Sequence, residues 1–306
     1  MNNPRPVVLQ LCPFSAYLES SLAAQFRVVR WFELDGAAQA SWLAQNAAQV
    51  RGIATGGRVG CPAALLLALP ALQVIAINGV GVDKVDLPLA ATRGVRVGTT
   101  PGVVADDVAD LAVGLVISLL RGIPAADAYV RAGQWPAGDR PLARKVSGCR
   151  FGIAGLGQIG AATAARLAPF GPVAYTGPQR KAVAYAFHED LISLARAVDV
   201  LVLTLPATPQ TRHIVNAAVL DALGSCGYLV NVARGAVVDE PALIEALQVG
   251  RIAGAALDVF ESEPQVPEAL RRHPRVVLTP HMATATAETR GQMADQVLAH
   301  LQSLLH

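Results

Sequence analysis

Short apolar runs alternate with segments of helical periodicity along nearly the whole chain. Runs that suit strands lie at Val7–Leu11, Val50–Ala54, Val74–Ile77, Arg150–Ala154, Val173–Tyr175, Val198–Leu205, Tyr228–Val232, Ala253–Val259 and Val276–Leu278. Runs such as residues 200–205 are apolar almost throughout, which is typical of strands covered on both faces by crossover helices. The pattern therefore predicts an α/β protein with doubly wound parallel sheets.

The pattern changes between Thr99 and Leu120, where two acidic residues precede an apolar stretch too long for a strand. This stretch predicts one long buried helix. Residues 131–148 are rich in Gly, Pro and charge, and are typical of a loop that leads into a new domain. The chain could also cross to the second domain near Val97 and return near Thr279, so we expect domains of residues 1–98 with 280–306 and of residues 99–279.

Composition excludes several classes of protein. With 306 residues, 53% hydrophobic and 16% charged, the chain can bury large cores and is not disordered. The net charge of +2 is not gathered into a basic run, so no nucleic-acid partner is expected. Leu111–Leu120 is about half of the roughly 20 residues that a membrane helix needs. The N-terminus lacks a secretory cleavage pattern, so we expect a cytoplasmic protein without a membrane span. The four scattered cysteines predict no metal site.

A glycine-rich motif follows the apolar run that ends at Ala154 and precedes a helix-forming segment. It matches G-x-G-x-x-G and consists of Gly155, Leu156, Gly157, Gln158, Ile159 and Gly160. Its glycines permit a tight turn, close approach of the backbone to a pyrophosphate, and packing of the helix on the strand. With strand and helix in place, the motif predicts dinucleotide binding.

The end of the next apolar run predicts which dinucleotide is preferred. NAD-binding proteins carry Asp or Glu there to hold the ribose 2′-OH, but this chain has Thr176 and Gly177. Arg180 and Lys181 follow, and either could pair with a 2′-phosphate that a carboxylate would repel. We therefore expect NADP(H) to be preferred, with NAD(H) possible.

Three polar residues follow three later apolar runs, at the sheet edge where ligands of parallel sheets bind. Arg234 supplies a cation, His281 a proton donor, and Glu263 a carboxylate that can keep this donor charged. Reduction of a 2-keto acid needs these three chemistries: one for the substrate carboxylate, one for the developing alkoxide, and one to hold the acid protonated. Their combination makes the three residues candidate catalytic residues.

The sequence resembles the D-isomer-specific 2-hydroxyacid dehydrogenases, within them the glyoxylate/hydroxypyruvate and hydroxyphenylpyruvate reductases. The resemblance covers nearly the whole chain. It rests on seven ordered blocks: NGVGVDKVD (78–86), TTPGVVADDVADLAVGL (99–115), GLGQIG (155–160), LPATPQTRHIVN (205–216), NVARGAVVDE (231–240), GAALDVFESEP (254–264) and LTPHMAT (278–284). The resemblance implies two Rossmann-like domains, a discontinuous flavodoxin-like substrate domain and an NAD(P)-binding domain, with the active site in the cleft between them.

The family also implies residue roles. Arg234 would bind and polarise the keto acid, and Glu263 would hold His281 protonated as proton donor. Backbone amides of a loop would hold the substrate carboxylate, and this loop comprises Asn78, Gly79, Val80 and Gly81. Further cofactor contacts would come from Leu205, Pro206, Val232, Ala233 and Asp258. Trp135 would line the substrate pocket of a neighbouring subunit in a homodimer formed through residues 103–120, unless it anchors its own loop.

The expected function is therefore NADPH-dependent reduction of a small 2-keto acid such as glyoxylate or hydroxypyruvate. An aryl pyruvate such as hydroxyphenylpyruvate is the alternative substrate. A corepressor-like protein that binds dinucleotide as a signal would keep the same three polar residues, although the chain has no disordered tail of the kind such proteins carry. A formate dehydrogenase is disfavoured, because formate oxidation needs no His–Glu acid–base pair.

Overall fold

The computed structural model describes residues 5–305, which form two compact units. The first comprises the described residues up to Val104 together with those from Thr284 onward, and the second comprises Ala105–Ala283. The chain thus leaves the first unit and returns to it with its C-terminal helix. Residues 131–148 lie wholly within the second unit, so this Gly- and Pro-rich loop does not lead into a new domain.

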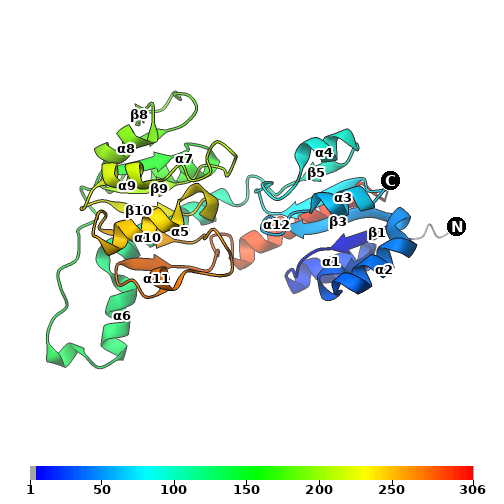
Figure 1. Ribbon diagram of the computed structural model, residues 1–306, viewed down its shortest axis with the longest axis horizontal. Coiled ribbons are helices and arrows are strands. Elements are labelled where there is room, and N and C mark those ends of the chain that lie inside the picture. Colours follow the sequence, from blue (N-terminus) through cyan, green and yellow to red (C-terminus); the bar gives the residue numbers. More distant parts are fainter. Residues whose placement is uncertain (1–4, 306) are drawn as a thin grey trace. The chain divides into compact units, whose positions relative to one another are not determined.

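The first unit is a five-stranded parallel sheet in the order β2-β1-β3-β4-β5. Its strands are β1 (Val7–Gln10), β2 (Arg27–Arg30), β3 (Val50–Gly56), β4 (Val74–Asn78) and β5 (Arg96–Gly98). Its helices are α1 (Ala16–Gln25), α2 (Gly36–Asn46), α3 (Ala63–Ala68), α4 (Leu87–Thr92) and α12 (Ala287–Gln302). Figure 1 shows the red C-terminal helix α12 among the blue N-terminal elements, and α12 contacts both β4 and α1.

Side chains that alternate along the strands build a core on each face of this sheet. Ile75 and Ile77 pack with α2, α3 and α4, whereas Val74 and Ala76 pack with α1 and α12. Because successive strand residues point to opposite faces, a strand covered on both sides must be apolar at every position. This requirement explains the uninterrupted apolar runs in the sequence.

The second unit is a seven-stranded parallel sheet in the order β12-β11-β10-β9-β6-β7-β8. Its strands are β6 (Phe151–Ala154), β7 (Val173–Thr176), β8 (Ala186–His188), β9 (Val200–Leu203), β10 (Tyr228–Asn231), β11 (Gly254–Leu257) and β12 (Val276–Leu278). Its helices are α5 (Ala105–Arg121), α6 (Ile123–Arg131), α7 (Gln158–Leu167), α8 (Leu191–Ala197), α9 (Ala217–Leu223), α10 (Glu240–Gln248) and α11 (Glu268–Arg271). Two doubly wound α/β units are therefore present, as the apolar pattern predicted.

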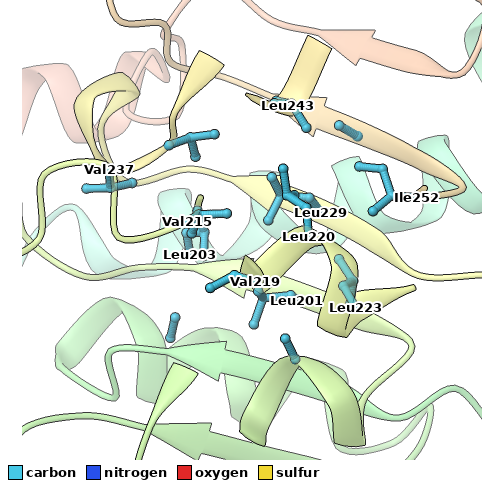
Figure 2. Packing of buried hydrophobic residues seen from close by; sticks show 14 of the residues in the cluster. Leu201, Leu203, Val215, Val219, Leu220, Leu223, Leu229, Val237, Leu243 and Ile252 are labelled. Carbon is cyan, nitrogen blue, oxygen red and sulfur yellow. The ribbon is translucent and has the colours of Figure 1, made fainter. Parts of the chain in front are cut away.

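Both faces of the second sheet are also covered. Leu201 and Leu203 of β9 pack with α8, α9 and α10. Figure 2 shows these side chains together with Leu220 and Leu229 of the same cluster. Val200 and Val202 point the other way, toward α5 and α7. The long apolar stretch predicted as a buried helix is α5. Its main packing partner is α7.

The apolar pattern did not predict three strands, β2, β5 and β8, which all lie at sheet edges. Their residues are exposed or only partly buried, so they need not be apolar at every position. Without two covered faces, such segments show no continuous apolar run. The fourth edge strand, β12, was predicted because all of its residues are apolar. Helix α6 was likewise not predicted, and none of its residues is buried.

Within the described residues, no single helix is long and apolar enough to cross a membrane. Only α5 and α6 taken together reach that length and apolarity, and the two are bent by 61° at Gly122.

Candidate active site

Strand order brings the three candidate catalytic residues to one edge of the second sheet. Arg234 follows β10, Glu263 follows β11 and His281 follows β12, and these three strands are neighbours. Because all of them are parallel, their carboxyl ends lie along the same edge. The strand topology thus brings together residues that are far apart in the sequence, such as Arg234 and His281, which are 47 positions apart.

His281 and Glu263 form a hydrogen-bonded pair. Nδ1 of the imidazole lies 2.7 Å from Oε2 of the carboxylate, and the two side chains are 22% and 19% exposed. The second oxygen, Oε1, accepts the backbone N–H of Phe260 at 3.0 Å, which fixes the carboxylate. Because Nδ1 is engaged by Glu263, Nε2 is the nitrogen able to serve a ligand.

The backbone of His281 adopts an uncommon conformation, with φ at +53°. For a residue other than glycine this left-handed conformation is costly, and such residues cluster at functional sites. A hydrogen bond from its own N–H to the carbonyl of Thr279, at 3.1 Å, helps to hold the turn. The ring is therefore held by its backbone as well as by Glu263.

Asp258 anchors the segment that carries His281. Its carboxylate is fully buried and accepts three hydrogen bonds, from the Thr279 hydroxyl at 2.6 Å, Met282 N–H at 2.9 Å and Ala283 N–H at 3.1 Å. A buried carboxylate needs such donors to offset its desolvation. The resemblance implied Asp258 as a cofactor contact, which stays a prediction. The structure shows that Asp258 holds the segment of His281 in place.

Arg234 projects from a turn that is tied to its own strand. The side chain of Asn231 donates to the Arg234 carbonyl at 3.0 Å and accepts the Ala233 N–H at 3.0 Å. Nη1 of Arg234 donates to the Ala233 carbonyl at 2.7 Å. A Cβ on the following Gly235 would lie 1.9 Å from the carbonyl carbon of Phe260, so only glycine lets these two loops approach.

Glu240 was not predicted from the sequence but supports the same loop. Its side chain is 7% exposed, and Oε1 accepts the N–H of Glu261 at 2.7 Å. Burial raises the pKa of the Glu240 carboxyl, the Glu261 N–H bond acts in the opposite sense, and the charges of Glu261 and Glu263 add to the rise. Acidic residues are common in the first turn of a helix, where they stabilise the helix dipole. Nothing in the sequence therefore indicated that Glu240 contacts the Glu261 loop.

The glycine loop has the shape that a pyrophosphate requires. Gly155 adopts φ +94° against Leu205, and a Cβ on Gly160 would lie 2.1 Å from the Gly155 carbonyl oxygen. Gly157 is the N-cap of α7 and has open space where its side chain would be. The free N–H groups of the first turn of α7 can therefore meet an anion without obstruction, so these residues fit a dinucleotide. The intervening residues Leu156, Gln158 and Ile159 complete the turn.

The loop after β7 holds the predicted ribose-binding residues. Thr176 ends β7, and its carbonyl accepts the N–H of Gly155 at 2.9 Å, which joins this loop to the glycine loop. The Lys181 ammonium donates to the Leu156 carbonyl, so this lysine already has a contact within the protein. Arg180 is exposed and makes no hydrogen bond or ion pair among residues 5–305. Arg180 is thus the more available cation.

The remaining predicted residues are placed as follows. Leu205, Val232 and Ala233 are buried after β9 and β10, and Pro206 is exposed. Trp135 is 62% exposed, so it does not anchor its own loop. The Asn78–Gly81 segment lies in the first unit, directly after β4, where Gly79 accepts the N–H of Thr100 at 2.9 Å.

Comparison with known proteins gives a family. Residues 113–283 match the model of the D-isomer specific 2-hydroxyacid dehydrogenase NAD binding domain. The hydroxyphenylpyruvate reductase of Plectranthus scutellarioides is 46% identical over 97% of this chain and 95% of its own length. Glyoxylate/hydroxypyruvate reductase A HPR2 of Arabidopsis thaliana is 44% identical over the same shares of the two chains.

A solved structure agrees with these sequence matches. The NADPH-dependent glyoxylate/hydroxypyruvate reductase SmGhrB of Sinorhizobium meliloti, in complex with NADP and malonate, superposes with a TM-score of 0.89 at 40% identity, covering 98% of this chain and 94% of that chain. The chain therefore belongs to the D-isomer-specific 2-hydroxyacid dehydrogenase family.

Proposed function

We propose that this chain is an NADPH-dependent reductase of small 2-keto acids, with glyoxylate or hydroxypyruvate as substrate and the D-2-hydroxy acid as product. The observation that carries the proposal is the His281–Glu263 pair, 2.7 Å apart, at the sheet edge that also holds Arg234. An imidazolium beside a carboxylate is the proton donor that carbonyl reduction needs. The Arabidopsis and Sinorhizobium relatives named above support this choice of substrate.

The residues of the chain then have complementary tasks. A reduced nicotinamide, when bound, supplies a hydride for the carbonyl carbon. Arg234 binds the keto acid and polarises its carbonyl through charge-assisted hydrogen bonds. As negative charge develops on the carbonyl oxygen, Nε2 of His281 donates its proton to that oxygen while Nδ1 stays bonded to Glu263. The amides of the Asn78–Gly81 loop stay the predicted partners of the substrate carboxylate.

Initial rates test this function directly. Glyoxylate, hydroxypyruvate and hydroxyphenylpyruvate are reduced with NADPH and with NADH, and loss of absorbance of the reduced nicotinamide is recorded. We expect the highest kcat/KM for the two small acids with NADPH. Preference for hydroxyphenylpyruvate would favour the activity named in the 46% identical relative. No turnover with any pair, despite binding of the cofactor, would leave the dinucleotide-sensing alternative.

Glu263→Gln tests the acid–base pair. The amide keeps the size of the side chain but removes the carboxylate whose Oε2 lies 2.7 Å from Nδ1 of His281. We expect kcat for reduction to fall while the KM for NADPH stays near the wild-type value. Glu261→Gln is the matched control, because that carboxylate pairs with His213 and Arg212 instead. Equal kcat in both variants and the wild type would contradict the pairing.

Thr176→Asp combined with Arg180→Ala tests the choice of cofactor. The new carboxylate can hold a ribose 2′-OH and repels a 2′-phosphate, while the available cation is removed. We expect the ratio of kcat/KM with NADPH to that with NADH to fall by about tenfold or more. Lys181→Ala measures the share of the second cation, which already bonds to Leu156. A double variant that still prefers NADPH would place the selection elsewhere in the chain.

We also propose that two copies associate. Helix α6 and the loop after it extend away from the rest of the second unit (Figure 1). Both expose large apolar side chains. These are Ile123, Val130, Trp135 and Leu142, the last fully exposed. Apolar surface of this kind, continuous with the predicted contact region 103–120, suits a twofold interface. Sedimentation velocity measures the mass in solution. The cytoplasmic location stays a prediction.

A further inference from the structure

The loop after β7 is tied together by the hydroxyl of a buried tyrosine. Residues 177–185, all of them described, form neither helix nor strand and connect β7 to β8. Such a segment needs contacts of its own to keep one conformation. The hydroxyl of Tyr175, on β7, accepts the N–H of Lys181 at 2.6 Å and donates to the Lys181 carbonyl at 3.4 Å. Tyr175 therefore ties the middle of the loop back to the strand that precedes it.

The position of this hydroxyl is fixed by the core. Tyr175 is 1% exposed, and the centre of its ring lies 5.3 Å from that of Phe187 on β8. Its backbone pairs with Ile153 and Phe187 in the sheet, so strands on both sides hold it. A phenylalanine would fill the same space, but a buried tyrosine hydroxyl needs a hydrogen-bond partner. Within the described chain, both of its hydrogen bonds go to Lys181.

Residue 181 is also tied to the glycine loop through its side chain. The Lys181 ammonium donates to the carbonyl of Leu156, and the N–H of Gly155 donates to the carbonyl of Thr176 at 2.9 Å. The loop after β7 is thus joined to the glycine loop at two places. Lys181 is thereby engaged as an anchor of the loop, which leaves the exposed guanidinium of Arg180 as the cation able to meet a ligand.

The bond from Tyr175 acts directly on the backbone of Arg180. The N–H of Lys181 belongs to the same planar peptide group as the carbonyl of Arg180. A hydrogen bond to that N–H therefore fixes the peptide group from which the arginine side chain extends. Each residue that is held in one conformation before a ligand binds spares an entropy cost at binding. The hydroxyl thus prepares the backbone of the predicted 2′-phosphate contact.

We propose that Tyr175 is a positioning residue for the choice of cofactor, and that its hydroxyl holds Arg180 ready for the 2′-phosphate of NADPH. The inference deepens the proposed function and rests on its preference for NADPH. A guanidinium pairs with a phosphate through charge-assisted hydrogen bonds that depend on its placement. NADH has a ribose 2′-OH at this point and gains nothing from a placed cation. The hydroxyl of Tyr175 therefore favours NADPH and leaves the affinity for NADH unchanged.

Tyr175→Phe tests this role, because it removes one oxygen atom and keeps the ring in the core. Titration that follows the fluorescence of the reduced nicotinamide, without substrate, gives the Kd of NADPH and of NADH. We expect the Kd of NADPH to rise about threefold to thirtyfold and that of NADH to stay near the wild-type value. Tyr129→Phe is the matched control, since it deletes a hydroxyl that bonds a different loop, at the Gly138 carbonyl 2.8 Å away. It should keep both values.

A double-mutant cycle shows whether Tyr175 acts through Arg180. In the Arg180→Ala background, Tyr175→Phe should leave the Kd of NADPH nearly unchanged, because no guanidinium remains to be placed. Hydrogen exchange of residues 177–185 without cofactor gives a second measurement, and it should be faster in Tyr175→Phe than in the wild type or Tyr129→Phe.

Three results would overturn the inference. These are a wild-type Kd of NADPH in Tyr175→Phe, an equal loss of affinity for NADPH and NADH, and an equal effect of Tyr175→Phe with and without Arg180. A wild type that binds NADH as tightly as NADPH would overturn the inference together with the proposed choice of cofactor. If no keto acid is reduced, the proposed reductase activity fails by itself, because the titration needs no substrate and still decides the role of Tyr175.

Discussion

His281→Ala is expected to lower kcat for reduction of hydroxypyruvate by roughly 10²- to 10⁴-fold, the usual contribution of a general acid. The imidazole is the group that we assign to protonation of the developing alkoxide. The KM for NADPH should change little, because the glycine loop and the loop after β7 are formed by other residues. Steady-state rates over a range of substrate and cofactor concentrations separate these effects.

His213→Ala is the matched control for this variant. His213 also has a positive φ, +49°, and its Nε2 lies 2.9 Å from a glutamate carboxylate, that of Glu261. It differs in following β9 through a long loop and in having no place in the proposed mechanism. Its replacement should leave kcat near the wild-type value. An unchanged kcat in His281→Ala would remove that residue from the mechanism.

Asp258→Ala is expected to weaken both stability and catalysis. It leaves the Thr279 hydroxyl and the N–H groups of Met282 and Ala283 without their acceptor, which is expected to lower the free energy of unfolding by about 2–4 kcal/mol. Since the same segment carries His281, kcat should also fall at temperatures where the variant is folded. Thermal unfolding and rates measured well below Tm give the two quantities.

Asp258→Asn separates the anchoring contacts from the charge. The asparagine keeps one oxygen for the Thr279 hydroxyl and Met282 N–H, but turns an NH₂ group toward the N–H of Ala283. Its Tm and kcat should lie between those of the wild type and Asp258→Ala. Wild-type Tm and kcat in Asp258→Ala would show that the buried carboxylate does not hold the His281 segment.

The sequence by itself was sufficient for the fold class and for the family. Strands covered on both faces must be apolar at each position, so nine of the strands stand out as runs such as that containing β9. The glycine motif is local as well: the turn, the approach to phosphate and the packing of α7 on β6 are all encoded within a few residues. Strand β2 escaped prediction, because its residues are exposed or only partly buried and two of its four positions are arginine.

The tertiary structure decided how the polar residues are brought together, although the resemblance to the family already implied the pairing of Glu263 with His281. The contact of Glu263 with His281, and that of Asp258 with the segment around Thr279, arise because β11 and β12 are adjacent and parallel. The sequence carries no direct sign of strand order. The same holds for Glu240 and the Glu261 N–H that it accepts, which are 21 positions apart. Such contacts depend on the order and register of strands, and these are set by the packing of the whole unit.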